Sequence, residues 1–299
     1  MRRLIPYLRY YWTEVMVGGK MDTGKNLDLL ATFYYLLWRA KYFPNKEVTV
    51  RVWGMKITAD KPKTLQQSLL EIFVHEVYRF DSQLEAPVIL DAGANIGISA
   101  LYFVRKYPGA EIVCVEPNPK AVTYLKKNIT ANNLSNIHIN EVALGADTGF
   151  GSLVESPNSL LNTTVNVSAL PTPIPVVALT SLMEKHSVDL MKLDIEGGEW
   201  EVLNHWLDLK SGLPCPREIL VELHPQKTAN SLAGRDLRHR LESQGYSASV
   251  IQHPFGSLLK ALLNEPFNAL WWAKKGVGCL IHFILAIAAI DQVLRWNPQ

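Results

Sequence analysis

The sequence predicts an α/β fold in which helices cover both faces of a parallel β-sheet. Short apolar runs at residues 88–90, 112–115 and 219–221 each precede a segment with helical periodicity. Runs of this length and apolarity suit strands that are buried on both faces. Since strands and helices alternate and the chain has no internal repeat, we expect a doubly wound sheet.

The first 85 residues are predicted to form an accessory cap that precedes this sheet. Residues 26–43 have the strongly apolar pattern of a helix, and residues 46–60 are typical of two strands joined by a tight turn. Residues 64–80 follow as an amphipathic helix that leads into the first strand of the sheet. The predicted divisions are therefore a cap at 1–85, a main domain at 86–275 and a terminal segment at 276–299.

The strongest local pattern is a glycine-containing loop at the end of the first predicted strand. Asp91, Gly93, Asn95 and Gly97 form the pattern D-x-G-x-N-x-G, in which Gly93 lets the backbone approach a ligand and Gly97 opens a helix packed tightly on the sheet. The next strand ends at Glu116, where a carboxylate can accept hydrogen bonds from both hydroxyls of a ribose. The pattern thus favours a nucleoside-containing cofactor, with an ordinary strand-to-helix turn and a solvated acid as the alternatives.

The middle of the chain continues the alternation and then departs from it. Residues 120–133 have the spacing of an amphipathic helix, and residues 136–144 form the third predicted strand. Residues 146–173 are rich in Ser, Asn, Thr, Pro and Gly, and we expect a long insertion there with short edge strands at 151–155 and 174–179. Insertions of this kind commonly shape substrate pockets.

A second set of polar residues lies on the later strands. Lys192 within a central strand requires a partner, and Asp194 shares its face. On the neighbouring strand Glu222 and His224 also share a face, so four ionisable groups can converge at the carboxyl edge of the sheet, where ligands bind in open α/β folds. A structural ion-pair network is the alternative for Lys192 and Glu222, and a structural loop histidine is the alternative for His224.

Composition and charge argue against several classes of protein. The chain has 299 residues and a net charge of only +2, without a dense basic block, which argues against extended nucleic-acid binding. Cys114, Cys215 and Cys279 are too far apart to suggest a disulfide framework or a zinc site. Arg9 and Glu14 interrupt the apolar N-terminus, so we predict no signal peptide and expect a cytoplasmic protein.

Five motifs together resemble the FkbM family of S-adenosyl-L-methionine-dependent methyltransferases, over roughly residues 70–250. They are VILDAGANIG, VCVEPNP, NEVALG, LMKLDIEGGEWEVL and ILVELHP. The D-x-G-x-N-x-G loop is found in class I methyltransferases broadly, whereas K-x-D-x-E-G-x-E is the signature of this family. The resemblance implies a Rossmann-like seven-stranded methyltransferase sheet whose reversed seventh strand residues 269–274 could supply. It also implies methyl transfer to oxygen, typically a hydroxyl of a sugar, glycolipid or natural product.

The resemblance also assigns site residues. Gly93 and Asn95 would line the methionine end of the cofactor, Glu116 would hold its ribose, residues 141–144 would lie by the adenine, and Asp194 and Glu196 would lie at the methyl-transfer face. The full set predicted to bind cofactor is Asp91, Gly93, Ala94, Asn95, Gly97, Glu116, Pro117, Glu141, Val142, Ala143 and Asp194. The set predicted to act in catalysis is Asp194, Glu196, His224, Lys192 and Glu222.

The expected reaction requires few catalytic groups, because the methyl group of a sulfonium is already activated. In-line transfer requires chiefly that the nucleophile, the methyl carbon and the sulfur are aligned. We predict Asp194 as the base or hydroxyl orienter, with His224 second, while Lys192 stabilises an oxyanion or holds a carboxylate. Asp194, Glu196, Glu222 and His224 are chemically able to bind a metal ion, but their spacing alone predicts no metal site. The expected partner is a small-molecule or glycan hydroxyl.

Three other functions compete with this prediction. An RNA ribose methyltransferase can place Lys, Asp and Glu at the same edge, although the chain lacks a basic stripe. A scaffold protein would bind S-adenosylmethionine without consuming it. An amino-methylating DNA enzyme is least favoured, since Asp194 is followed by Ile195-Glu196-Gly197 rather than by Pro-Pro and an aromatic residue.

The most apolar stretch of the chain, residues 277–290, lies near the C-terminus. It is shorter than the roughly 20 residues that a helix needs to span a bilayer. We expect an apolar helix buried on the domain or in a homodimer interface. The alternative is a peripheral membrane contact through residues 277–296, in which flanking Trp, Lys and Arg side chains lie near lipid headgroups.

Overall fold

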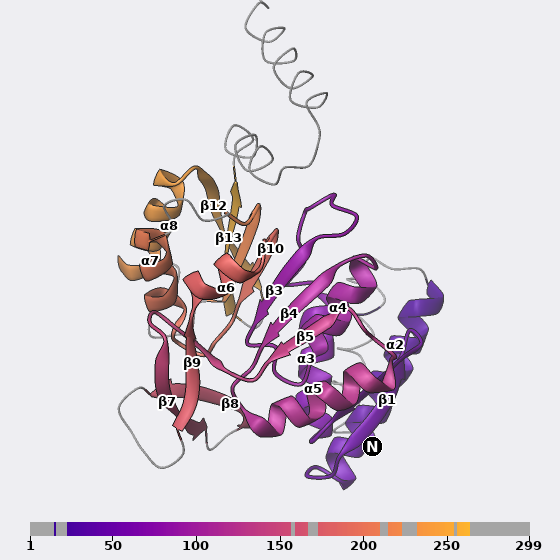
Figure 1. Cartoon of the computed structure of the whole chain (residues 1–299). Helices are drawn as coiled ribbons and strands as arrows, with labels where there is room; N and C mark the ends of the chain where they lie inside the picture. The colour runs from indigo at the N-terminus through magenta and orange to yellow at the C-terminus, as the bar shows by residue number, and fades with distance from the viewer. Residues whose placement is uncertain are drawn as a thin grey trace, which may run out of the picture.

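A seven-stranded, mostly parallel sheet forms the centre of the protein in the computed structural model (Figure 1), which confirms the predicted α/β fold. The structure describes residue 15 and residues 23–156, 159–166, 173–209, 215–222, 232–253 and 256–263. The strand order is β12-β13-β11-β10-β3-β4-β5. These strands are β3 (Val88–Ala92), β4 (Glu111–Val115), β5 (Ile137–Asn140), β10 (Leu190–Leu193), β11 (Glu218–Glu222), β12 (Tyr246–His253) and β13 (Gly256–Leu263).

One strand runs against the others, but it is not the predicted one. β13 is antiparallel to both β11 and β12, so Gly256–Leu263 supplies the reversed strand and its assignment to residues 269–274 is wrong. The reason is local: β12 and β13 pair along their whole length as a hairpin, from Tyr246↔Leu263 to His253↔Gly256. Residues 269–274 lie outside the described residues.

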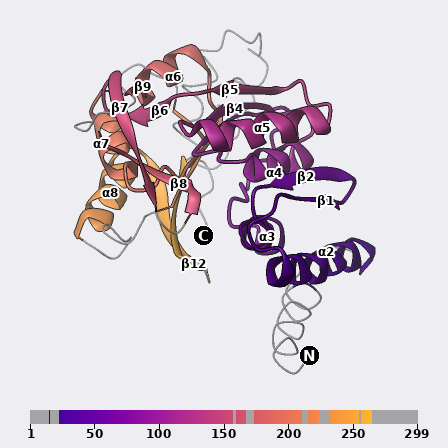
Figure 2. The ribbon, with the colours of Figure 1, turned by 90° about the horizontal axis from the view of Figure 1, so that it is seen from below.

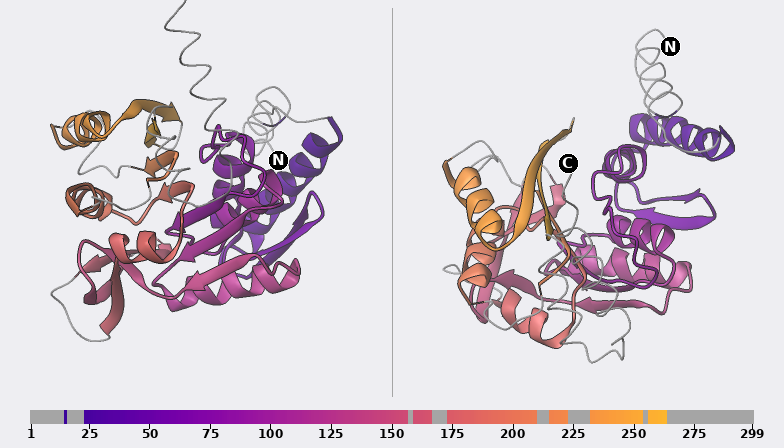
Figure 3. Two further views of the ribbon diagram at one scale, coloured as in Figure 1. Left: turned by 45° about the horizontal axis from the view of Figure 1, so that its top comes forward. Right: turned by 90° about the horizontal axis from the view of Figure 1, so that it is seen from above.

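Successive residues of each strand point to opposite faces of the sheet, so they belong to two separate hydrophobic cores. Ile89 and Ile112 belong to one core, whereas Leu90 and Val113 belong to the other. Residues of α4 and α5 contribute to the first core, together with the cap, and residues of α6, α7 and α8 contribute to the second. Figures 2 and 3 show these two groups on opposite sides of the molecule. The bounds are α4 (Ile98–Lys106), α5 (Pro119–Ala131), α6 (Leu179–Lys185), α7 (Glu199–Leu209) and α8 (Leu232–Ser243).

The cap contains a helix, a hairpin and a second helical segment. They are α2 (Thr23–Tyr42), β1 (Val48–Val52), β2 (Met55–Ala59), α3 (Pro62–Ser68) and the π-helical turn η2 (Leu69–Val74). The predicted first helix and the antiparallel hairpin are confirmed.

The predicted helix over 64–80 is too long, because helical structure ends at Val74. Glu76 then takes a left-handed backbone conformation, with φ of 50°, while its buried carboxylate accepts hydrogen bonds from Arg79 and Tyr102. A residue in that conformation cannot continue a right-handed helix. The chain instead enters the sheet as an irregular segment that carries Tyr78 and Phe80.

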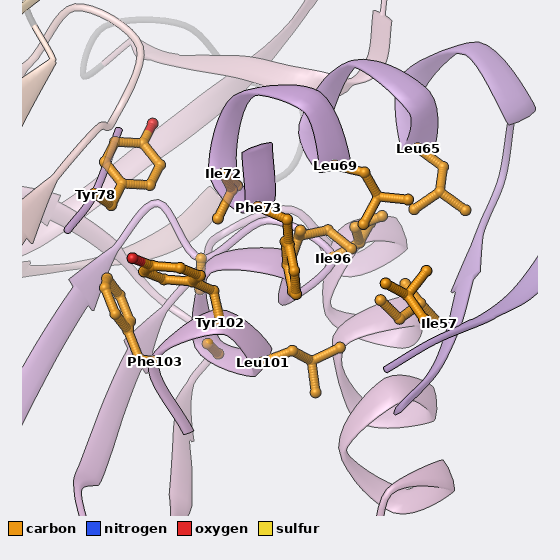
Figure 4. Close-up of a cluster of buried hydrophobic side chains, with 14 of the residues drawn as sticks. Ile57, Leu65, Leu69, Ile72, Phe73, Tyr78, Ile96, Leu101, Tyr102 and Phe103 are labelled. Atoms are coloured by element: carbon orange, nitrogen blue, oxygen red, sulfur yellow. The ribbon is translucent and has the colours of Figure 1, made fainter. Parts of the chain in front are cut away.

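Aromatic side chains join this segment to the core beneath it. The ring of Phe73 lies 5.7 Å from that of Tyr102, measured between centroids, and Phe80 lies 5.5 Å from Phe103. Figure 4 shows Tyr78 at the edge of this cluster, with its hydroxyl directed away from the other labelled side chains. The cap and the first face of the sheet therefore share one core.

The insertion forms a second sheet, which the sequence did not predict as a unit. Its strand order is β6-β9-β7-β8, with β6 (Ala143–Gly145), β7 (Gly149–Ser156), β8 (Ser159–Asn166) and β9 (Pro173–Ala178). The expected edge strand at 151–155 falls within β7, and the one expected at 174–179 matches β9 except for its last residue, because Leu179 begins α6. The predicted third strand over 136–144 is split, because the chain leaves the central sheet after Asn140 and starts β6 at Ala143.

The structure covers the predictions about the cysteines and about the apolar C-terminal segment only in part. Cys114 and Cys215 are free thiols, and Cys279 lies outside the described residues. None of the described helices combines the length and apolarity that a bilayer span needs. The predicted apolar helix at 277–290 lies outside the described residues and stays a prediction, as do the dimer and membrane contacts assigned to it.

Hydrogen bonds of Asn128 on α5 join the cap hairpin to the main domain. Its side chain is fully buried, accepts a hydrogen bond from the Thr58 backbone N–H at 2.7 Å and donates to the carbonyl of Thr58 at 3.0 Å. It also donates at 2.9 Å to the carbonyl of Ile96 in the glycine loop. One amide therefore links the hairpin, the helix and the loop.

We expect Asn128→Asp to lower the free energy of unfolding by about 2–4 kcal/mol, because a carboxylate leaves two buried carbonyls without donors. Asn132→Asp is the matched control: Asn132 lies one helical turn further on and makes the same pair of contacts with Lys56, but at the solvent-exposed surface. Urea denaturation should show a small effect for the control. Equal losses in both variants would contradict the role given to burial.

Candidate active site

The glycine loop after β3 is shaped by its approach to the end of β10. Gly93 has φ of 77°, and a Cβ there would lie 1.6 Å from the carbonyl oxygen of Asp194. The glycine is therefore required for contact between two segments of the chain rather than only for approach of a ligand. Gly97 has φ of 88°, and its added Cβ would meet Leu125 of α5 at 2.5 Å, so this glycine permits close helix packing.

Lys192 is buried beneath this loop and binds it. The Lys192 side chain is 2% exposed, and its Nζ lies 2.8 Å from the carbonyl oxygen of Gly93. The same Nζ lies 3.4 Å from Asp91 Oδ1 and 3.3 Å from Asp194 Oδ2. Burial alone would lower the pKa of Lys192, but Asp194, Asp91 and Glu222 together raise it above its ordinary value. The ammonium stays charged and joins β3, the loop and β10.

Glu116 lies at the end of β4, with its carboxylate directed toward the glycine loop. Its Oε2 accepts a hydrogen bond from the backbone N–H of Asn95 at 2.9 Å, and its Oε1 accepts one from Asn118 at 2.8 Å. Burial raises the pKa of Glu116 to about 7, although these two backbone donors act in the opposite direction. Each oxygen has a further lone pair with which it can accept a hydroxyl hydrogen.

Asp194 and Glu222 are joined through Tyr78, a residue not predicted from the sequence. The Tyr78 hydroxyl lies 3.0 Å from Asp194 Oδ2 and 2.6 Å from Glu222 Oε2. The tyrosine comes from the segment that joins η2 to β3, far from both acids in sequence. The prediction that Lys192, Asp194 and Glu222 converge at the carboxyl edge is thus correct, whereas His224 lies outside the described residues.

The loop after β10 is held by a buried acid. Glu199 at the start of α7 accepts hydrogen bonds from the backbone N–H groups of Ile195 and Gly197 at 2.9–3.0 Å. This contact stabilises a loop in which Glu196 has φ of 60° and Gly197 has φ of 110°. Glu199, the last residue of the K-x-D-x-E-G-x-E pattern, therefore stabilises the loop that carries Glu196.

These segments surround a cavity of about 340 Å³, within the size range of small-molecule sites. It lies at the carboxyl ends of β3, β4 and β10, where open α/β sheets bind ligands. Among the described residues, every charged side chain that lines it is acidic. These residues are Glu116, Asp147, Asp194, Glu196 and Glu201.

The predicted site residues divide into two groups by position. Those that line the cavity are Gly93, Asn95, Glu116, Pro117, Ala143, Asp194 and Glu196. Those described residues that do not line it are Asp91, Ala94, Gly97, Glu141, Val142, Lys192 and Glu222. Asp91 is instead buried and accepts a hydrogen bond from Ser99 at 2.6 Å, and Glu141 is an exposed acid paired with Lys126.

Several lining residues were not predicted from the sequence. Asp147, Thr148 and Phe150 come from the second sheet and the turn before it, and Glu201 and Val202 come from α7. The composition of residues 146–173 indicates an insertion that can form a wall of a pocket, but it does not single out individual residues. No cluster of three or more His, Cys, Asp or Glu side chains suited to a metal ion occurs in the described part of the chain.

Comparison with known proteins gives a consistent result. Residues 91–248 match the family described as "Methyltransferase FkbM domain". The chain is 28% identical to Methyltransferase sdnD of Sordaria araneosa, over 46% of this chain and 68% of that protein. It is 27% identical to Methyltransferase 1 of Beauveria bassiana, over 60% of this chain and 80% of the relative.

A solved structure titled Methyltransferase FkbM, from Methylobacillus flagellatus KT, aligns with a TM-score of 0.43 and 18% identity. The alignment covers 78% of this chain and 58% of that one, so this chain spans little more than half the length of the crystallised protein.

Glu116 generates a prediction about pH. If it accepts hydroxyl hydrogens from the ribose of S-adenosylmethionine, binding requires the carboxylate, and affinity should fall about tenfold for each pH unit below about 7. Above that pH the affinity should level off. Glu116→Gln should weaken binding by about 1.5–3 kcal/mol and flatten the profile, because the amide has only one acceptor oxygen. Titration calorimetry across this range measures both effects.

Glu141→Gln is the control for this experiment, because Glu141 was also predicted to lie near the cofactor but does not line the cavity. Its affinity and its pH profile should match those of the unmodified protein. A normal profile in Glu116→Gln would reject the assignment of Glu116.

Proposed function

The chain belongs to the FkbM methyltransferase family, and from that premise we propose that it transfers the methyl group of S-adenosyl-L-methionine to a hydroxyl of a sugar, glycolipid or other natural product. The observation that carries this proposal is the acidic cavity at the carboxyl edge of the sheet, with Asp194 at its wall. The relatives from Sordaria araneosa and Beauveria bassiana are themselves named as methyltransferases.

The residues around the cavity fit this cofactor. Glu116 offers a buried carboxylate for the ribose hydroxyls, and Ala143, Leu144 and Val176 offer apolar surface for a base. Asp194 and Glu196 also line the cavity, and their negative charge favours a sulfonium cation over a phosphate. S-adenosylmethionine supplies an activated methyl group, so the protein has mainly to align it and accept a proton.

Asp194 is the group best placed to accept that proton. Its side chain is 22% exposed and lines the cavity, while Oδ2 is fixed by Lys192 and Tyr78. A carboxylate fixed in this way can orient an acceptor hydroxyl and remove its hydrogen as the new bond forms. Lys192 is already bound to the loop carbonyls, so it holds Asp194 rather than contacting the acceptor.

The acidic lining of the cavity also makes RNA a less favourable substrate. An RNA substrate would bring phosphates to a cavity whose lining includes the acidic side chains of Asp147, Glu196 and Glu201. A neutral hydroxyl acceptor meets no such repulsion. Salt-sensitive retention of the protein on RNA, together with methylation of ribose, would favour RNA instead.

We expect Asp194→Asn to keep the fold and much of the affinity for S-adenosylmethionine but to slow methyl transfer by about 100-fold or more, since an amide cannot take up the proton. Transfer of a radiolabelled methyl group to a panel of glycans, glycolipids and polyketide alcohols measures this. The product should be a base-stable ether. Exclusive labelling of amines would reject O-methylation, and exclusive labelling of carboxylates, which gives methyl esters, would reject a hydroxyl acceptor. Binding without turnover on any acceptor would favour a scaffold protein.

Glu201→Gln provides the matched control, because Glu201 is another acid of the cavity wall and has no part in the proposed proton transfer. Its turnover should stay within a few-fold of the unmodified enzyme. Near-normal turnover in Asp194→Asn would reject Asp194 as the base and direct attention to His224.

A further inference from the structure

Helix α2 exposes a stripe of apolar side chains on the surface of the cap, and this aromatic stripe has no part in the candidate active site. Tyr35, Trp38 and Tyr42 are 42%, 49% and 55% exposed. Leu27 and Ala31 are exposed as well and continue the stripe toward the start of the helix. At about 3.6 residues per turn, the five positions fall within an arc of about 80°, so they form one face of α2.

The rings of the aromatic stripe pack against one another at the surface. The ring centroid of Trp38 lies 6.2 Å from that of Tyr35 and 5.9 Å from that of Tyr42. It also lies 5.6 Å from the ring of Phe43, which follows the helix and is exposed. Contiguous exposed apolar surface of this kind marks an interaction site more often than scattered apolar residues do.

The opposite face of α2 already packs against the protein. Leu29, Phe33 and Leu36 are buried in the core that the cap shares with the sheet. The helix therefore cannot enter a bilayer as a spanning segment without exposing that core. The aromatic stripe is the face of α2 that can lie against another surface.

Positive charge is concentrated around the stripe. Residues 23–56 contain six basic and two acidic side chains, whereas the net charge of the whole chain is only +2. Arg39 and Lys41 flank the stripe on its two sides, as the helical spacing requires. The guanidinium carbon of Arg39 lies 5.2 Å from the ring centroid of Phe43. The Nζ of Lys41 lies 4.9 Å from the ring centroid of Tyr42.

This combination is typical of a contact with the membrane–water interface. Trp and Tyr rings lie at the level of the lipid headgroups, and long basic side chains reach the phosphates from the same depth. Figures 2 and 3 show α2 at the outer edge of the molecule. An exposed helix face at an edge can lie along a flat surface with the rest of the domain behind it.

We propose that α2 docks the protein on an anionic lipid bilayer, with the aromatic stripe in the interfacial region and the helix axis roughly parallel to the membrane plane. The rings supply apolar contact, and the basic side chains attract the anionic headgroups. No residue of α2 lines the cavity, so this docking surface goes beyond the proposed function. Vesicle binding through it requires neither S-adenosylmethionine nor a methyl acceptor.

Flotation of the full chain with lipid vesicles tests the proposal. At low salt we expect the protein to bind vesicles that contain phosphatidylglycerol at least about tenfold more tightly than vesicles of phosphatidylcholine alone. The triple variant Tyr35→Ser, Trp38→Ser, Tyr42→Ser should lose about tenfold or more in affinity for the anionic vesicles, because three aromatic side chains no longer enter the interface.

The matched control for the stripe is Leu209→Ser combined with Ile251→Ser and Leu262→Ser. These are also large, exposed apolar side chains, but they lie on α7, β12 and β13. Their removal should leave the vesicle affinity within about twofold of that of the unmodified protein.

A second pair of variants tests the contribution of charge. Lys41→Gln should weaken binding to the anionic vesicles by about fivefold, and added salt should reduce this difference. Lys185→Gln is its control, because Lys185 is likewise a lysine in the last turn of a helix, but on α6. Its affinity should not change.

Each contrary outcome identifies a different error. Failure of the unmodified protein to float with either kind of vesicle would overturn docking on a membrane. Equal affinity of the stripe variant and the unmodified protein would assign vesicle binding to another part of the chain and overturn the role of α2. Conversion of a dimer into a monomer by the stripe variant, measured by light scattering, would mean that a second copy of the chain covers the stripe instead.

A conservative variant decides the question if the triple variant does not fold. Brominated lipids quench tryptophan emission at the depth of the bilayer interface, so Trp38→Phe should remove part of the quenching seen in the unmodified protein. Unchanged quenching in that variant would place Trp38 away from the lipid and overturn the proposal.

Discussion

The buried ammonium of Lys192 is the interaction on which the rest of this site depends. It lies inside the sheet and contacts the carbonyls of Ala92 and Gly93 as well as Asp91 and Asp194. A buried charge is costly unless it is paired and hydrogen-bonded. Because these partners belong to β3, the glycine loop and the end of β10, satisfying one ammonium fixes three segments relative to one another. The close approach of Gly93 to Asp194 is the consequence.

The cap contributes to this centre as well as covering a face of the sheet. Its last segment carries Tyr78 to the two carboxylates, and Asn128 ties its hairpin to the glycine loop through Ile96. The cap and the first face share one apolar core, so these polar contacts are held by packing over a wide area. A part of the chain with no recognisable motif thus positions residues of the candidate active site.

Acidity gives the cavity its chemical character. Burial leaves Glu116 with a pKa of about 7, and Asp194 and Glu196 add negative charge to the lining. A cavity of this kind suits a cationic cofactor and an uncharged acceptor better than it suits a polyanion. The loop that carries Glu196 is itself fixed by Glu199, so one acid shapes the surface on which another is presented.

The sequence by itself determined the sheet, its cofactor loop and the family, because apolar strand runs, glycines and strand-end acids act over short distances along the chain. It placed Gly93, Asn95, Glu116 and Asp194 correctly at one edge. Tertiary structure alone decided that Tyr78 joins Asp194 to Glu222, since that contact spans more than a hundred residues and follows from the left-handed turn at Glu76. Tertiary structure also decided that Gly256–Leu263 is the reversed strand, because its position in the sheet depends on antiparallel pairing with β12. The apolar pattern of one segment does not reveal which strand it will pair with.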